Sequence, residues 1–154
     1  MRRVRVVGVG SALGDDAAGV LAVRAARAEL ERLGVDVREV GAGAHLLDLL
    51  EGPDVVIVVD AVWVQGMEPG EIVRVEAGPH GLPAELRTSL SSHGVGVSEA
   101  VALASAMPDP PRVILLGVAL AEGRGGVRPS ARVLGSVPEL AARVLAEAAA
   151  LSRG

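Results

Sequence analysis

Residues 54–60 read DVVIVVD, five consecutive β-branched residues between two acids. A short, uninterrupted apolar run of this kind predicts a strand that is buried on both faces. Such strands are typical of parallel sheets, whose two faces are covered by the helices that connect the strands. The stretch therefore favours an α/β fold.

The rest of the chain alternates between strand-like and helix-like segments. We predict strands at residues 4–9, 35–40, 54–60, 70–75 and 112–119, with 70–75 at an edge. We predict helices at residues 16–33, 44–50 and 137–151, and one from Ser92 or His93 to about Met107. This order indicates a single domain over residues 1–154, a twisted, mostly parallel sheet of about five strands sandwiched between helices (phosphorylase/hydrolase-like).

Composition narrows the range of functions. The 154 residues include no cysteine, phenylalanine or tyrosine and one tryptophan, and the net charge is -4. Thiolate nucleophiles and cysteine-ligated zinc are therefore excluded, and neither a basic footprint nor aromatic stacking platforms for nucleic acid are present. No apolar run approaches the roughly 20 residues that span a bilayer. We expect a soluble, cytoplasmic protein that binds neither nucleic acid nor membranes.

Polar side chains cluster where the predicted strands end. Asp15 and Asp16 follow the first strand, Asp60 ends the strand at 54–60, and His93 precedes a helix. Ligands of open α/β sheets bind beyond the carboxyl ends of the strands, so we expect these groups to lie near one another. Oxygen and nitrogen ligands of this kind suit divalent metals such as nickel or zinc.

Each of these residues also has a structural explanation. Asp15 is a good helix N-cap, Asp16 is favoured in a first turn by the helix dipole, and His93 lies in a turn-forming sequence. Asp60 is the hardest to explain structurally, because an ionised carboxylate among apolar residues is costly unless it is paired.

The loop after the first strand has a second interpretation. Gly8, Gly10 and Gly14 partly match the glycine spacing of dinucleotide-binding loops, and Glu39 could act as the ribose-binding acid. A pyrophosphate would then lie beside Asp15 and Asp16, whose charges repel it and attract a cation. A dinucleotide-binding module remains the alternative.

Three motifs together resemble the hydrogenase maturation endopeptidases: GVGSALGDDAAG (8–19), VVIVVDAV (55–62) and SSHGVGVSEAVALA (91–104). GAGAHLLDLL (41–50) and RVILLGVAL (112–120) are secondary matches, so the resemblance extends over nearly the whole chain. This chain differs from the family pattern in two places. Ser11 stands where the family usually has Asn, and the loop after the first strand is one residue shorter before Asp15 and Asp16.

The resemblance implies an aspartic-type endopeptidase that activates a nickel-iron hydrogenase. It would remove the C-terminal extension of the large-subunit precursor after nickel insertion, acting as a monomer. Matched motif to motif, Asp16, Asp60 and His93 would be the catalytic residues and contact the nickel, with Asp15 as an alternative to Asp16. The nickel would come with the substrate, and no resting cofactor is expected. A water activated by a carboxylate is the expected nucleophile. A non-catalytic metal-binding chaperone with the same three residues is a further alternative.

Overall fold

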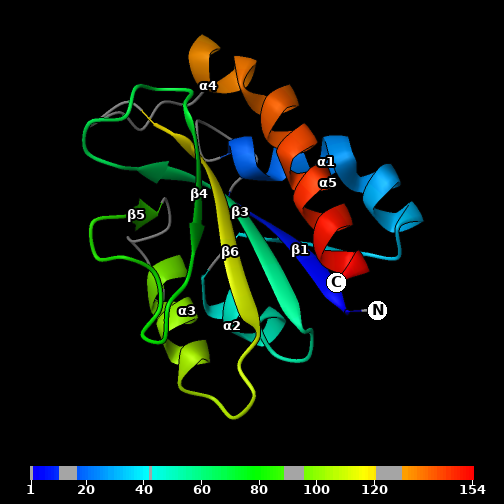
Figure 1. Ribbon diagram of the computed structural model, residues 1–154. Helices are drawn as coiled ribbons and strands as arrows, with labels where there is room; N and C mark the ends of the chain where they lie inside the picture. The colour runs from blue at the N-terminus through cyan, green and yellow to red at the C-terminus, as the bar shows by residue number, and fades with distance from the viewer. Residues whose placement is uncertain (1, 11–16, 42, 89–95, 121–129) are drawn as a thin grey trace.

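The computed structural model describes residues 2–10, 17–41, 43–88, 96–120 and 130–154 (Figure 1). Its strands are β1 (Val4–Val9), β2 (Asp36–Val40), β3 (Val55–Trp63), β4 (Ile72–Glu76), β5 (Arg87–Thr88) and β6 (Arg112–Ala119). Its helices are α1 (Ala17–Arg32), α2 (Gly43–Leu49), α3 (Val97–Ser105), α4 (Ala131–Gly135) and α5 (Val137–Arg153).

The strands form one mostly parallel sheet, which confirms the predicted α/β architecture. The order is β2-β1-β3-β6-β4, in which β2, β1, β3 and β6 are parallel and β4 pairs antiparallel with β6 at the edge. The short β5 pairs antiparallel with the end of β3. The chain passes from β1 to β2 on one side and then crosses back past β1 to β3 on the other side, so the switch in strand order lies between β1 and β3.

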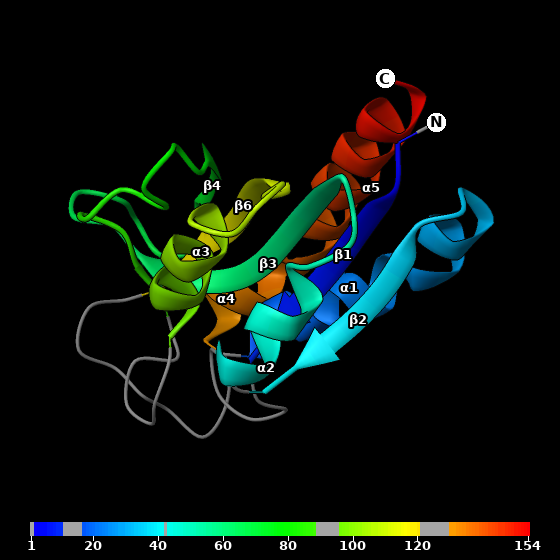
Figure 2. The ribbon, with the colours of Figure 1, turned by 90° about the horizontal axis from the view of Figure 1, so that it is seen from below.

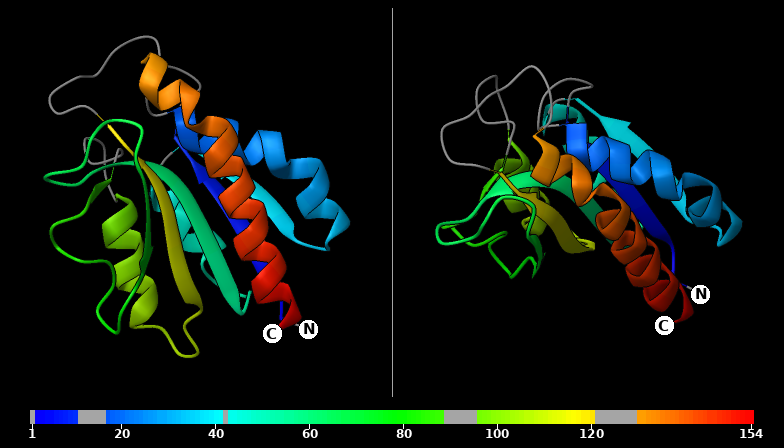
Figure 3. Two further views of the ribbon diagram at one scale, coloured as in Figure 1. Left: turned by 45° about the horizontal axis from the view of Figure 1, so that its top comes forward. Right: turned by 90° about the horizontal axis from the view of Figure 1, so that it is seen from above.

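Helices cover both faces of the sheet, as Figures 2 and 3 show. The core beneath α1 and α5 contains Ile57 and Val59 of β3, whereas the core beneath α2 and α3 contains Val56 and Val58 of the same strand. Alternate residues of β3 therefore enter opposite cores, which explains why this strand is apolar at every position from 55 to 59.

The first helix ends at the predicted glycine. Gly34 has a φ of +79°, and its N–H donates to the carbonyl of Glu31 while the N–H of Val35 donates to that of Leu30. These two bonds form a Schellman motif, which favours glycine because its left-handed residue otherwise carries a Cβ penalty.

Two predicted element boundaries were wrong. The predicted caps Ser92 and His93 do not begin α3, which starts at Val97 with Gly96 as its N-cap. The strand at 54–60 does not end at Asp60, because pairing with β6 and β5 extends β3 to Trp63. The short α4 and β5 were not predicted. The predicted loop at 122–130 lies almost wholly outside the described residues.

The start of the described chain, just before β1, and the end of α5 lie side by side at the amino edge of the parallel strands (Figures 1 and 2). The guanidinium group of Arg2 lies against Gly154, where an added Cβ would be 3.3 Å from Cζ of Arg2. None of the helices in the described part of the chain is long and apolar enough to cross a membrane.

Candidate functional site

Asp60 is completely buried in β3, with an exposed fraction of 0%. Among the residues that the structure describes, Asp60 is the only buried residue with a charged or polar side chain. Its Oδ1 accepts a hydrogen bond of 2.8 Å from the backbone N–H of Ala61. Burial of an ionisable carboxylate is costly, so its presence in a strand otherwise made of apolar residues indicates a specific role.

The position of Asp60 in the sheet matches the ligand-binding edge of open α/β folds. Pairing between β1 and β3 ends at Gly8 and Val59, so Asp60 is the next residue of β3 after its pairing with β1 stops. On its other side, Asp60 is paired with Gly117 of β6. Asp60 therefore lies at the switch between β1 and β3, where such folds bind their ligands.

Asp54, the acid just before the same strand, has a different environment. It accepts a 2.7 Å hydrogen bond from the backbone N–H of Arg3, and its carboxylate lies 3.5 Å from the Arg3 guanidinium. The backbone hydrogen bond is the main reason why the pKa of Asp54 is held below its ordinary value. Asp54 thus has a structural role, and the two acids of DVVIVVD are not equivalent.

The other predicted site residues, Asp15, Asp16 and His93, lie outside the described residues. Asp16 directly precedes Ala17, the first residue of α1, and His93 is four residues before Val97, where α3 begins. Within the described ranges, no three His, Cys, Asp or Glu side chains form a group that could hold a metal ion. The grouping of Asp16, Asp60 and His93 therefore stays a prediction.

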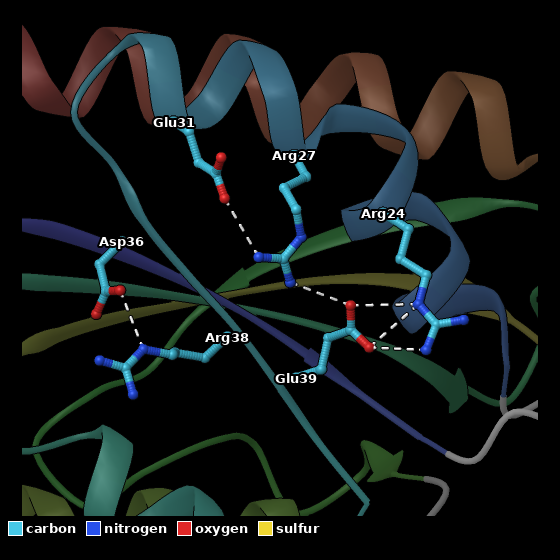
Figure 4. Close-up of polar contacts among 6 residues, drawn as sticks. All are labelled: Arg24, Arg27, Glu31, Asp36, Arg38 and Glu39. Atoms are coloured by element: carbon cyan, nitrogen blue, oxygen red, sulfur yellow. Dashed lines mark hydrogen bonds and ion pairs between the residues drawn. The ribbon is translucent and has the colours of Figure 1, made fainter.

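Glu39, the candidate ribose-binding acid, is held by two arginines of α1 (Figure 4). Arg24 donates to its carboxylate from Nη2 at 2.9 Å and from Nε at 3.1 Å, and Arg27 donates at 3.2 Å. The hydrogen bond from Arg24 is the largest cause of the lowered pKa of Glu39. A ribose hydroxyl would have to compete with these charge-assisted bonds, which weighs against the dinucleotide interpretation.

Two hollows lie near the carboxyl edge of the sheet, on either side of β3. One, of about 580 Å³, is lined by Met67, by residues 69–72 and by Arg132, Ser136 and Glu139 of the α4–α5 region. The other, of about 410 Å³, is lined by residues 38–41 and by His45, Asp48 and Leu49 of α2. The strand that carries Asp60 thus runs between two recessed surfaces.

A tight turn builds the first of these hollows. The N–H of Glu71 donates to the carbonyl of Glu68, and Gly70 between them has a φ of +92°. Gly70 also donates to the carbonyl of Ala119 at 2.9 Å and accepts a 2.6 Å bond from the Ser136 hydroxyl. These bonds connect the turn to the carboxyl end of β6 and to the α4–α5 junction.

Comparison with known proteins identifies the family. The model of the family described as "Hydrogenase maturation protease" matches residues 21–147. The chain belongs to the hydrogenase maturation protease family. The matched range includes Asp60 and His93 and begins after Asp15 and Asp16. Members of this family of hydrogenase maturation proteases are peptidases.

A curated relative supports the assignment. The hydrogenase expression/formation protein HupD of Thiocapsa roseopersicina is 34% identical over 135 residues. The aligned region covers 82% of this chain and 59% of HupD, so the chain spans somewhat more than half the length of this relative.

Solved structures of hydrogenase maturation proteases share the fold. The [NiFe] hydrogenase maturation protease HybD from Thermococcus kodakarensis has a TM-score of 0.70 at 24% identity, covering 95% of this chain and 99% of that one. The hydrogenase maturating endopeptidase HybD from E. coli has a TM-score of 0.67 at 23% identity, covering 94% and 91%.

Gly117, the cross-strand partner of Asp60, was not predicted to belong to the site. A single glycine within the buried run RVILLGVA was the available signal, because an isolated glycine in a strand often marks a close approach of other groups.

Proposed function

We propose that this member of the hydrogenase maturation proteases is an endopeptidase that processes the large-subunit precursor of a nickel-iron hydrogenase. It removes the C-terminal extension of the precursor after nickel has been inserted, and it recognises the nickel held by the substrate. The observation that carries the proposal is the buried carboxylate of Asp60 at the β1–β3 switch, in a chain of this family.

In this proposal Asp16, Asp60 and His93 complete the coordination of the substrate's nickel, with Asp15 as the alternative to Asp16. Carboxylate and imidazole groups are suitable ligands for that metal. Binding the metal places the neighbouring peptide bond beside the carboxylates, and positioning of this kind lowers reaction barriers substantially. A water that Asp16 or Asp60 deprotonates attacks the peptide carbonyl, the C–N bond of the resulting tetrahedral intermediate breaks, and the carboxylic acid returns the proton to the leaving amine. The protein itself carries no resident cofactor and acts in the cytoplasm as a monomer.

The burial of Asp60 supports a role for its charge. Because the surrounding strand is apolar, an ionised Asp60 gains from an approaching cation more than an exposed carboxylate would. Asp54, at the exposed end of the strand, is already paired with Arg3 and has no such role.

The test compares these two acids within one strand. Purified Asp60→Asn and Asp54→Asn variants are incubated with nickel-loaded precursor, and release of the C-terminal peptide is followed by mass spectrometry. We expect Asp60→Asn to lose cleavage and Asp54→Asn to retain it, while circular dichroism shows both to be folded. Asp16→Asn and His93→Ala are expected to lose cleavage as well.

The outcomes separate the proposed protease from the alternatives. Full cleavage of the nickel-loaded precursor by the Asp60→Asn variant would contradict the metal-recognition model. A wild-type protein that binds the nickel-loaded precursor but releases no peptide would instead be a metal-binding chaperone. Saturable binding of NAD without any response to nickel would favour the dinucleotide-binding module.

A further inference from the structure

The pairing of β3 has a gap on the side of β1, at the position of Asp60. On this side, pairing with β1 ends at Val59 and pairing with β5 begins at Val62. Residues 60 and 61 fall between these two ladders, and both are paired with β6 on the other side of β3. In the described part of the chain, the β1 side of β3 therefore has a gap of two residues between its neighbouring strands.

The backbone N–H of Ala61 faces this gap. The N–H of Leu120, just after β6, donates to the carbonyl of Val62 at 2.9 Å, so the main-chain groups of Val62 face β6. Main-chain groups of successive strand residues point to opposite sides, so those of Ala61 face the gap. There the N–H of Ala61 donates to Oδ1 of Asp60 at 2.8 Å. The carboxylate of Asp60 is therefore turned toward the β1 side of β3.

The side chains of Asp60 and Ala61 start from opposite faces of the sheet. Ala61 is completely buried in the core beneath α1 and α5. Val58 and Val62 belong to the core beneath α2 and α3, and Asp60 shares their face because side chains alternate along a strand. The packed methyl group of Ala61 thus fixes the peptide unit whose N–H holds the carboxylate.

We infer that Ala61 is a positioning residue: its backbone N–H holds Oδ1 of Asp60 and so orients the carboxylate toward the gap at the β1–β3 switch. The inference rests on the proposed function, in which Asp60 binds the substrate's nickel. A hydrogen bond to a carboxylate is about twice as strong as one between neutral groups. Orientation matters because a misplacement of about 1 Å can lower a rate by about 100-fold.

The test removes the N–H of Ala61 and keeps its side chain. Lactic acid in place of Ala61, incorporated by nonsense suppression, replaces the amide with an ester that has no N–H to donate. The control is the same exchange at Val58, with α-hydroxyisovaleric acid in place of valine. Val58 is completely buried in the same strand, and its main-chain groups face β6 as those of Val62 do. The control therefore removes a donor from the sheet and leaves the N–H of Ala61 intact.

Single-turnover cleavage of nickel-loaded precursor and Tm are measured for both esters, with cleavage at a temperature where circular dichroism shows each protein to be folded. We expect the ester at position 61 to lower the rate constant at saturating enzyme by about 10-fold or more. The ester at position 58 should lower Tm and leave the rate constant near that of wild type. Equal rate constants for the two esters, or a loss of rate that follows the loss of Tm in both, would overturn the inference.

Amide hydrogen exchange tests the same bond without cleavage. In the wild-type protein, the N–H of Ala61 should be protected about as strongly as that of Val62. In Asp60→Ala, its protection relative to Val62 should fall by about 10-fold or more, because the acceptor is removed. Unchanged relative protection would overturn the inference, and this measurement decides the matter if the ester at position 61 does not fold. Failure of the proposed function is recognised separately, by full cleavage with Asp60→Asn.

Discussion

Gly117 of β6 is the cross-strand partner of Asp60 in β3, so the position beside the buried carboxylate carries no side chain. A Cβ at Gly117 would lie 2.9 Å from both γ-carbons of Val62 and 3.4 Å from the carbonyl oxygen of Asp60. Val62 already fills the space that a residue at 117 would use. The sheet thus has no room for a larger residue next to Asp60.

Gly117→Ala should therefore destabilise the protein. The added methyl group has to displace Val62, which is fully buried, and overpacking of this kind costs about 1–3 kcal/mol. Urea unfolding measures the loss. The matched control is Gly135→Ala in α4, where an added Cβ meets nothing within 4 Å and no loss is expected. Equal stability of the two variants would contradict the crowding described at Gly117.

Arg5→Lys should weaken the attachment of α2 to the sheet. Arg5 donates from Nε to Asp36 at 2.6 Å and from Nη1 to the carbonyl of Leu49, the last residue of α2, at 2.9 Å. A lysine ammonium has no planar fork and cannot hold both partners in this geometry, so we expect a loss of about 1–2 kcal/mol in urea unfolding.

Arg38→Lys is the control for this change, because Arg38 also donates to Asp36, at 3.0 Å, but from a half-exposed position. Its loss should be under about 0.5 kcal/mol, as for most exposed ion pairs. Similar losses in the two variants would show that the bond to Leu49 contributes little.

Glu39 should make part of the stability depend on pH. Hydrogen bonds from Arg24 and Arg27 hold its pKa in the folded protein below its ordinary value of 4.5. The unfolded chain therefore binds the proton first, and the contribution of Glu39 is present above about pH 4.5 and lost as pH falls through the folded-state pKa. The difference in unfolding free energy between wild type and Glu39→Gln should therefore shrink as pH falls below about 4.5.

Added salt provides the control for the Glu39 experiment. The Arg24 side chain is 55% exposed, so 0.5 M NaCl should reduce the difference between wild type and Glu39→Gln at neutral pH. A difference that changes with neither pH nor salt would contradict an electrostatic role for Glu39.

Much of the fold could be predicted because local signals agree with tertiary structure. The apolar runs at β1 and β6 are strands with the predicted bounds, 4–9 and 112–119, and α1 ends beside Gly34 as predicted. The end of β3 could not be predicted, because its last residues are held by β5 and β6, which are remote in sequence. The start of α3 was misplaced because Ser92 is a favoured N-cap residue type, whereas Gly96 caps the helix without a side-chain bond.

The candidate site could be predicted only at Asp60, where a charged residue type occurs in a strand that is expected to be buried. Asp60 could be singled out because an acid within an apolar strand has few structural explanations, and its complete burial agrees with that interpretation. Asp16 and His93 occur in sequences that also suit helix caps and turns, so their roles remain predictions. Gly117 stands out in sequence as a single glycine in an apolar strand, but its closeness to Asp60 depends on the pairing with β3, which the sequence does not reveal.

The neighbouring termini have a practical consequence for handling the protein. Both ends leave the amino edge of the parallel strands, whereas Asp60 lies toward the carboxyl edge. An affinity tag or carrier domain fused to either end would therefore extend away from the candidate site. Molecules tethered to a surface through Gly154 would present the edge that carries Asp60 to the solution, and a short linker between the ends would allow circular permutation.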